Sequence, residues 1–103
     1  MSKVFLYGEF QTLVPSFTKD LWGPVNEELK GVKGLINKTW MYGIGVNTVG
    51  GFYEFDSIEH AQAFATGLYA EQAKRVGASL SVKLFDGDAV EEASRDMKSP
   101  HYS

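Results

Sequence analysis

Apolar and polar residues alternate along short segments of the chain. Near the N-terminus the aliphatic Val4 and Leu6 alternate with Phe5 and Tyr7, and such a two-residue period is typical of a β-strand. Other segments repeat this alternation or are rich in β-branched and aromatic residues, and glycines at positions 43 and 45 permit a hairpin turn. The pattern predicts four strands, at residues 3–11, 35–42, 45–55 and 79–85.

Longer segments between these strands carry apolar residues at helical spacing. The first contains Pro24, which removes a backbone hydrogen bond, so we expect a kink there or a helix that begins only at Pro24. The second is expected to be capped by Asp56 or Ser57, with Asp56 and Glu59 in the spacing of a capping box, and Gly77 suits its C-terminal end. The polar tail, residues 99–103, is expected to be too short to pack alone. The predicted helices are residues 16–32, 57–76 and 88–97.

The predicted order of elements is β-α-β-β-α-β, which is the ferredoxin-like arrangement of the α+β class. Right-handed crossovers place both helices on one face of a four-stranded antiparallel sheet and leave the other face open. A large apolar face is usually buried rather than exposed, so we expect a homodimer that encloses a space between two sheets. The rings assigned to the open face are Phe5, Tyr7, Trp40, Tyr42, Phe52 and Phe85.

Composition narrows the class of protein. The 103 residues fit one domain spanning residues 1–103, and a formal net charge of −3 gives no broad cationic surface for nucleic acid or anionic lipid. Cysteine is absent, which excludes disulfides and a thiol nucleophile and fits a reducing compartment. No N-terminal apolar run is long enough for a membrane span or signal peptide. We therefore expect a cytoplasmic protein that binds neither nucleic acid nor membrane.

Aromatic residues make up 14% of the chain, which suggests a cavity lining or an interface in addition to a core. If the hairpin turns near residues 43–46, Lys38 and Trp40 lie opposite Phe52 and Glu54 on the open face. In that register Lys38 and Glu54 form an ion pair. A one-residue slip would exchange the faces.

A proton-transfer site needs an ionisable group in a part-apolar cavity, because desolvation raises the pKa of a carboxyl group and lowers that of a lysine. Glu9 and Glu54 are the candidate bases, and Lys83 completes the predicted catalytic set. Structural alternatives stay open: Lys38 as a solubilising charge on an edge strand, Glu9 as a solvated carboxylate and Trp40 as packing. The side chains expected to bind substrate are Tyr7, Lys38, Trp40, Tyr42, Phe52 and Phe85.

The sequence has no pattern for a protein-built metal site or a bound nucleotide. His60 and His101 lack the close spacing of metal ligands, although a single axial ligand to haem stays open. There is no glycine-rich phosphate loop and no nucleophile elbow. We therefore expect no cofactor. Gly50 and Gly51, inside a predicted strand, indicate a bulge or a close approach by another group.

Four motifs stand out along the chain: GLINKTW at residues 34–40, GGFYEF at 50–55, AQAF at 61–64 and VKLFD at 82–86. Together with Pro24 they resemble the YdhR-like monooxygenase family of the dimeric α+β barrel superfamily, and the similarity covers most of the chain. The resemblance implies a homodimer whose C-terminal arm, which begins near residue 88, reaches over the partner.

The resemblance also implies an activity, that of a cofactor-independent monooxygenase acting on a small aromatic or polyketide-like substrate in the barrel cavity. Glu9 or Glu54 would remove a phenolic or enolic proton, and Tyr7, Trp40 or Lys83 would donate hydrogen bonds to the oxyanion. An isomerase or cyclase that uses the same base is an alternative. A non-catalytic dimer that binds an apolar metabolite is another.

Overall fold

The computed structural model describes residues 2–13 and 17–102. No helix in these ranges is long and apolar enough to cross a membrane. The predicted C-terminal helix is present in a shorter form, and the other predicted elements follow in the expected order. The elements are β1 (Val4–Gln11), α1 (Lys19–Lys30), β2 (Leu35–Tyr42), β3 (Thr48–Phe55), α2 (Ile58–Thr66), α3 (Leu68–Arg75), β4 (Ser79–Asp86), α4 (Glu91–Asp96) and the 3-10 helix η1 (Pro100–Tyr102).

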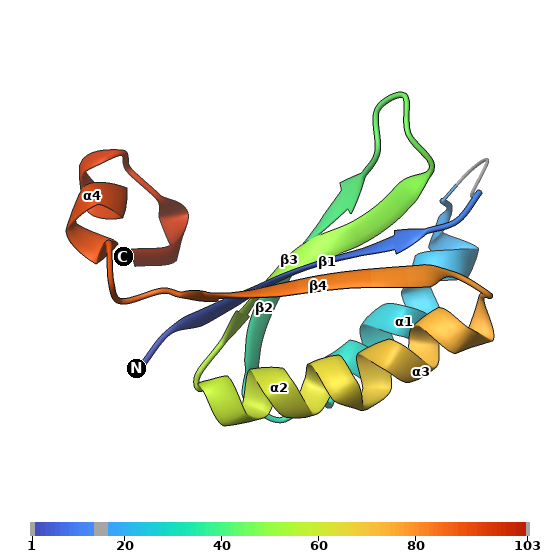
Figure 1. The fold of residues 1–103 in the computed structure, drawn as a ribbon, viewed down its shortest axis with the longest axis horizontal. Coiled ribbons are helices and arrows are strands. Elements are labelled where there is room, and N and C mark those ends of the chain that lie inside the picture. The colour runs from blue at the N-terminus through green and yellow to red at the C-terminus, as the bar shows by residue number, and fades with distance from the viewer. Residues whose placement is uncertain (1, 14–16, 103) are drawn as a thin grey trace.

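The strands form one antiparallel sheet in the order β2-β3-β1-β4. Figure 1 shows α1, α2 and α3 together below this sheet, whereas α4 stands apart from them near the far end of β4. We call the surface under α1, α2 and α3 the helix face and the opposite surface the open face. The predicted ferredoxin-like α+β fold is confirmed.

The hydrophobic core lies between the helix face and the helices. Val4 and Leu6 of β1 and Tyr53 and Phe55 of β3 are each at most 1% exposed. Fully burying side chains of this size contributes about 1.5–3 kcal/mol each, so the alternation of β1 decides which face the helices cover. The helices complete the core with Leu29, Ala61, Phe64 and Tyr69.

Two helices differ from their predicted form. The first runs through Pro24, so the alternative in which it begins only at that residue is wrong. The second is divided at Gly67 into α2 and α3. A Cβ atom on Gly67 would lie 2.7 Å from the carbonyl oxygen of Ala63, so this break in the helix requires a residue without a side chain.

The N-terminal cap of α2 is Ser57, whose side chain accepts a hydrogen bond from the backbone N–H of His60 at 3.2 Å. Of the two predicted caps Ser57 is therefore confirmed, and the capping box between Asp56 and Glu59 is wrong. Asp56 instead contacts the His60 ring, with 2.6 Å between Oδ1 and Nδ1.

An irregularity in β2 changes which of its side chains face the helices. Leu35 pairs with Phe55 on the helix face, but Asn37 already pairs with Glu54 on the open face, which leaves Ile36 without a partner. Beyond such a bulge every side chain lies on the face opposite to that expected from unbroken alternation. The predicted open-face positions of three residues are therefore wrong, and the helix face instead receives Lys38, Trp40 and Tyr42, which pair with Tyr53, Gly51 and Val49.

The C-terminal segment packs on the open face of its own chain. Tyr102 is buried and its hydroxyl donates to the carbonyl oxygen of Gly87 at 2.6 Å. The His101 ring lies 5.2 Å from the ring of Phe5 and 5.5 Å from that of Phe52. The tail therefore does not pack alone, because the open-face rings give it an apolar surface. Its reach over a partner chain stays a prediction.

Candidate active-site cavity

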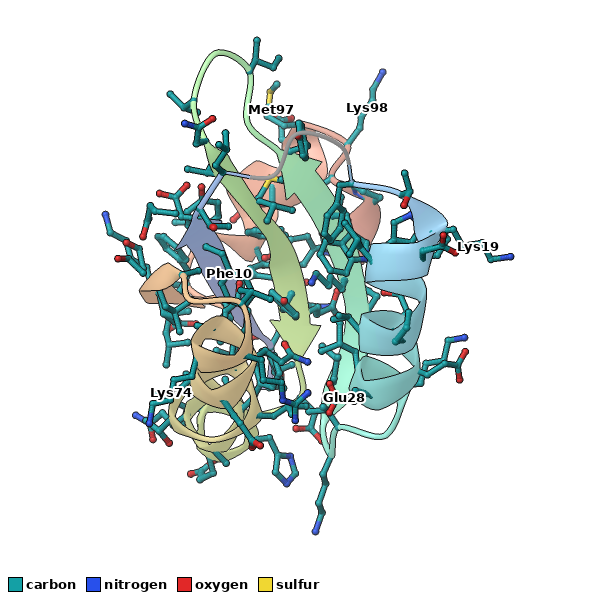
Figure 2. The ribbon with its side chains drawn as sticks, turned by 90° about the vertical axis from the view of Figure 1, so that its right-hand side faces the viewer. Phe10, Lys19, Glu28, Lys74, Met97 and Lys98 are labelled. Carbon is teal, nitrogen blue, oxygen red and sulfur yellow. The ribbon has the colours of Figure 1, made fainter. Side chains whose placement is uncertain are left out.

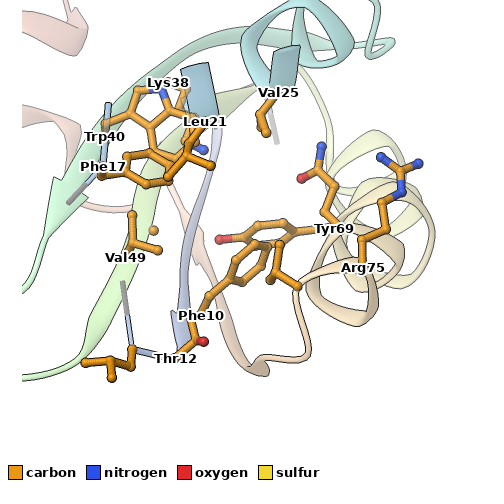
Figure 3. Close-up of a pocket in the computed structure, with 14 residues that line it drawn as sticks. Phe10, Thr12, Phe17, Leu21, Val25, Lys38, Trp40, Val49, Tyr69 and Arg75 are labelled. Atoms are coloured by element: carbon orange, nitrogen blue, oxygen red, sulfur yellow. The ribbon is translucent and has the colours of Figure 1, made fainter. Parts of the chain in front are cut away.

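A cavity of about 520 Å³ lies between the helix face, α1 and α3. Figure 2 shows α1 and α3 apart from each other on the same face of the sheet, with the strands visible between them. In Figure 3, Phe17 and Trp40 gather on one side of the cavity, Phe10 and Tyr69 lie across from them, and Arg75 stands at the far edge. The described lining residues include no carboxylate, so the cavity suits an apolar, flat ligand without positive charge.

Two glycines make room for the side chains of this cavity. Gly8 and Gly51 are direct partners on β1 and β3 and lie on the helix face. A Cβ atom on Gly8 would lie 2.3 Å from Cε2 of Tyr69, and one on Gly51 would lie 2.5 Å from Cε of Lys38. The tyrosine ring and the lysine stem therefore rest directly on the backbone of the sheet. At Gly51 this is the close approach predicted from the sequence, whereas none was predicted at Gly8.

Lys38 brings an amine into these aromatic surroundings. Its Nζ lies 3.1 Å from the ring centroid of Trp40 and 4.6 Å from that of Tyr53. No ion pair joins Lys38 to any carboxylate of the described residues. Burial lowers the pKa of Lys38 to about 7, and the two ring faces are what favours its charged form. The unprotonated amine is therefore well populated near pH 7.

Trp40 is fixed from two sides. Its Nε1 donates to Oδ1 of Asn26 in α1 at 2.8 Å, and its ring lies 5.1 Å from that of Phe17. These contacts hold the indole as a rigid wall beside the amine, so that Lys38 keeps its position over the ring.

The hydroxyl groups of Tyr53 and Tyr69 are buried and have no hydrogen-bond partner among the described residues. Burial raises the pKa of Tyr69 to about 12, and burial also raises that of Tyr53. Both phenols stay protonated at neutral pH. Neither can serve as an anion that would neutralise the Lys38 ammonium.

The edge of the cavity near α1 and α3 is closed by polar groups that are already paired. Glu28 of α1 accepts hydrogen bonds from Arg75 at 2.9 Å and from Gln72 at 3.2 Å. Arg75 also contacts Glu71 at 3.2 Å. The guanidinium is therefore occupied, and Lys38 is the cation of the lining without an ionic partner in the described residues.

The other predicted site residues lie on the open face. Direct pairing places Tyr7 beside Phe52 and Lys83 in one row, and Phe5 beside Glu54 and Phe85 in the next. Glu9 lies on the same face, opposite Gly50. Six predicted site residues therefore share the open face: Tyr7, Glu9, Phe52, Glu54, Lys83 and Phe85. The sheet separates them from Lys38, Trp40 and Tyr42 on the helix face.

Glu54 has partners other than the predicted one. Lys3 Nζ lies 2.8 Å from its carboxylate, His101 Nδ1 lies 3.0 Å away, and Asn37 donates at 3.3 Å. Burial raises the pKa of Glu54, but the hydrogen bonds from Lys3 and His101 outweigh this and the pKa is lowered. The predicted pair of Lys38 and Glu54 is wrong, because the bulge in β2 puts them on opposite faces.

Glu9 is also held by its neighbours on the open face. It accepts hydrogen bonds from the hydroxyl of Tyr7 at 2.9 Å and from Nε2 of Gln11 at 2.8 Å. The bond to Glu9 raises the pKa of the Tyr7 hydroxyl. A smaller hollow of about 240 Å³ next to these groups is lined by Tyr7, Glu9, Met41 and Tyr42.

Sequence reasoning missed several cavity residues, chiefly Tyr69, Phe10 and Phe17. The helix break at Gly67 shifts the phase of the buried stripe, so that α3 buries Tyr69, which the unbroken helix pattern does not include. The signal that was available is the pair of strand glycines. Among the described residues no group of three or more His, Asp or Glu side chains could hold a metal ion.

Comparison with known proteins supports the fold. No protein-family model matches the sequence, and no curated protein matches it. A solved structure from Deinococcus radiodurans, named as an antibiotic biosynthesis monooxygenase, matches with a TM-score of 0.59 at 10% identity and covers 81% of this chain and 90% of its own.

Two Streptomyces structures are similar to the same extent. A monooxygenase from the gene ActVA-Orf6 of Streptomyces coelicolor, in complex with nanaomycin D, matches with a TM-score of 0.58 at 14% identity over 82% of this chain and 85% of its own. SnoaB of Streptomyces nogalater, a cofactor-independent oxygenase, matches with a TM-score of 0.57 at 11% identity over 85% of this chain and 95% of its own. The chain therefore shares its fold with these monooxygenase structures.

Proposed function

We propose that this protein is a cofactor-independent monooxygenase for a small, flat aromatic or polyketide-like compound bound between the helix face, α1 and α3. The observation that carries the proposal is the aromatic-walled cavity of about 520 Å³ that contains an amine with no ionic partner in the described residues. The fold shared with a cofactor-independent oxygenase supports it. So does the shared fold with a monooxygenase that was solved with nanaomycin D.

The chemistry starts with a proton transfer. A phenolic or enolic O–H of the substrate gives its proton to the unprotonated Nζ of Lys38, because a base with a pKa near the working pH serves best. The electron-rich anion then reduces O₂ directly. For an anthrone-type CH₂ group, one oxygen atom becomes the new carbonyl and the other leaves as water with the two hydrogens of that carbon. The apolar walls exclude bulk water from the anion.

An isomerisation or cyclisation begins with the same proton transfer and does not consume oxygen. The cavity serves both reactions equally well. Oxygen uptake distinguishes them.

The open face supports a second location for the site. Phe85, opposite Phe5, is 48% exposed there, and Met41, next to Tyr7 and Glu9, is 37% exposed. An exposed apolar sheet face favours association with a second copy. In such a homodimer Glu9, Glu54 and Lys83 would line the space between two sheets, as predicted from the sequence. Glu54 is already paired with Lys3 and His101, which lower its pKa and weaken it as a base.

Oxygen uptake with a panel of hydroxyquinols and anthrones tests the proposal. With the site on the helix face, Lys38→Met lowers the rate at least about 10²-fold, the usual scale of a lost general base, while Glu9→Gln and Glu54→Gln stay within about twofold of wild type. The reverse pattern, together with a dimeric mass in solution, moves the site to the open face. Turnover without oxygen uptake points to an isomerase or cyclase, and binding without turnover rejects an enzyme.

A further inference from the structure

The lysines of this chain occupy two very different settings. Lys3 is part-buried but forms an ion pair with Glu54 at 2.8 Å and donates to the carbonyl oxygen of His101 at 2.7 Å. Lys38 contacts ring faces and has no ion pair in the described part of the chain. A buried amine without a counter-ion favours its neutral form, which is the form that acts as a nucleophile.

The position of Lys38 also leaves it open to a ligand. Its side chain lines the 520 Å³ cavity and a neighbouring cavity of about 350 Å³ that lies against α1. The stem is supported by Gly51, and the head lies over Trp40, which its hydrogen bond to Asn26 holds still. The amine is therefore positioned on a rigid wall, next to a space with room for a bicyclic ring.

We propose that Lys38 captures aromatic aldehydes and ketones as an imine in this cavity. The inference rests on the cavity of the proposed function but not on its oxygen chemistry. The amine nitrogen attacks the carbonyl carbon, a C–N bond forms, and the carbonyl oxygen becomes a hydroxyl group by taking a proton from nitrogen. Loss of the hydroxyl with the second amine hydrogen, as water, gives the C=N bond. Amine and carbonyl thus yield imine and water, and no oxidant or reductant takes part.

The surroundings favour this product over the ammonium form of Lys38. An unprotonated imine is neutral, whereas an ammonium group carries a positive charge. Imine formation therefore removes the free-energy cost of holding a cation in an apolar cavity. The aromatic part of the ligand would lie between Trp40 and Phe17 on one side and Phe10 and Tyr69 on the other, as their arrangement in Figure 3 allows. The absence of carboxylates from the described lining also leaves no fixed anion to draw the amine back into its charged form.

Reductive trapping tests the inference. The full-length protein is incubated at pH 7 with 2-naphthaldehyde and sodium cyanoborohydride, without oxygen, and each lysine-containing peptide is quantified by mass spectrometry. Lys38 has an about 10³-fold larger unprotonated fraction than an ordinary lysine at this pH. We expect its labelling to be at least about tenfold faster than that of the exposed Lys74, after allowance for lower intrinsic nucleophilicity.

Variants and a pH profile separate capture from non-specific labelling. Lys38→Met keeps an unbranched apolar side chain and removes the fast labelling, whereas Lys74→Met leaves it unchanged. The labelling rate of Lys38 levels off above pH 7, while that of other lysines keeps rising. Labelling spread evenly over the lysines, or fast labelling that survives in Lys38→Met, overturns the inference. Oxygen uptake by the wild type without labelling of Lys38 overturns the inference too, but leaves the proposed function standing. Labelling of Lys38 without oxygen uptake supports the inference and contradicts the proposed function.

Discussion

The two faces of the sheet carry similar polar residues but differ in how these residues are paired. On the open face, Lys3, Glu54 and His101 satisfy one another, and the C-terminal segment closes over Phe5. On the helix face, the hydroxyl of Tyr69 is buried without a hydrogen-bond partner in the described residues, and the part-buried Lys38 has no ionic partner there. Structural polar groups are usually paired, so the difference marks the helix face as the side prepared for a ligand.

The largest expected effect on stability comes from a methyl group added to the sheet backbone under the cavity. Gly8→Ala should lower the free energy of unfolding by about 1–3 kcal/mol, because the added methyl group overlaps the rigid Tyr69 ring. Chemical denaturation measures this effect. Gly23→Ala in α1 is the matched control, since the nearest atom to its Cβ is 3.9 Å away. It should change the free energy of unfolding by less than about 1 kcal/mol, because alanine is the better helix former but Pro24 disfavours a Cβ on the residue before it. Equal effects of the two substitutions would mean that the ring does not rest on Gly8.

A smaller effect on stability is expected when one hydroxyl group is removed from each face of the sheet. Tyr102→Phe removes the hydrogen bond to the Gly87 carbonyl and should destabilise the protein by about 1 kcal/mol. Tyr69→Phe removes a hydroxyl group that has no partner in the described residues, so the free energy of unfolding should stay the same or rise slightly. The two variants are compared in the same denaturation experiment. Destabilisation by Tyr69→Phe as large as that by Tyr102→Phe would show that the Tyr69 hydroxyl is paired and that the helix face is not exceptional.

The sequence predicts the structure correctly where apolar residues recur at a regular spacing. The alternation of Val4 and Leu6 predicts the helix face of β1, and the whole order of elements follows from such local patterns. The bulge at Ile36 has no local signature, because one extra residue leaves the composition of β2 unchanged. Lys38 and Trp40 were therefore placed on the wrong face.

Contacts between distant segments were equally hidden. His101 reaches Glu54 across 47 positions of the chain, and nothing in the polar tail indicates that it packs on the sheet. The division of a predicted helix at Gly67 depends on a close backbone approach, and it turns Tyr69 toward the core. The glycines at positions 8 and 51 were the signal that could have pointed to a hollow helix face.

The protonation of Lys38 tests the central claim most directly. Burial lowers its pKa to about 7, so a ¹³C-detected titration of the lysine Cε signals, with Lys38→Met to assign the resonance, should give a midpoint near pH 7. Between that value and about 10.4, the ordinary lysine pKa, the folded protein then binds fewer protons than the unfolded chain, and its stability rises with pH. A Lys38 midpoint near the ordinary value, with no such rise, would contradict the account, because the amine would then be solvated or paired and the helix face would hold no prepared site.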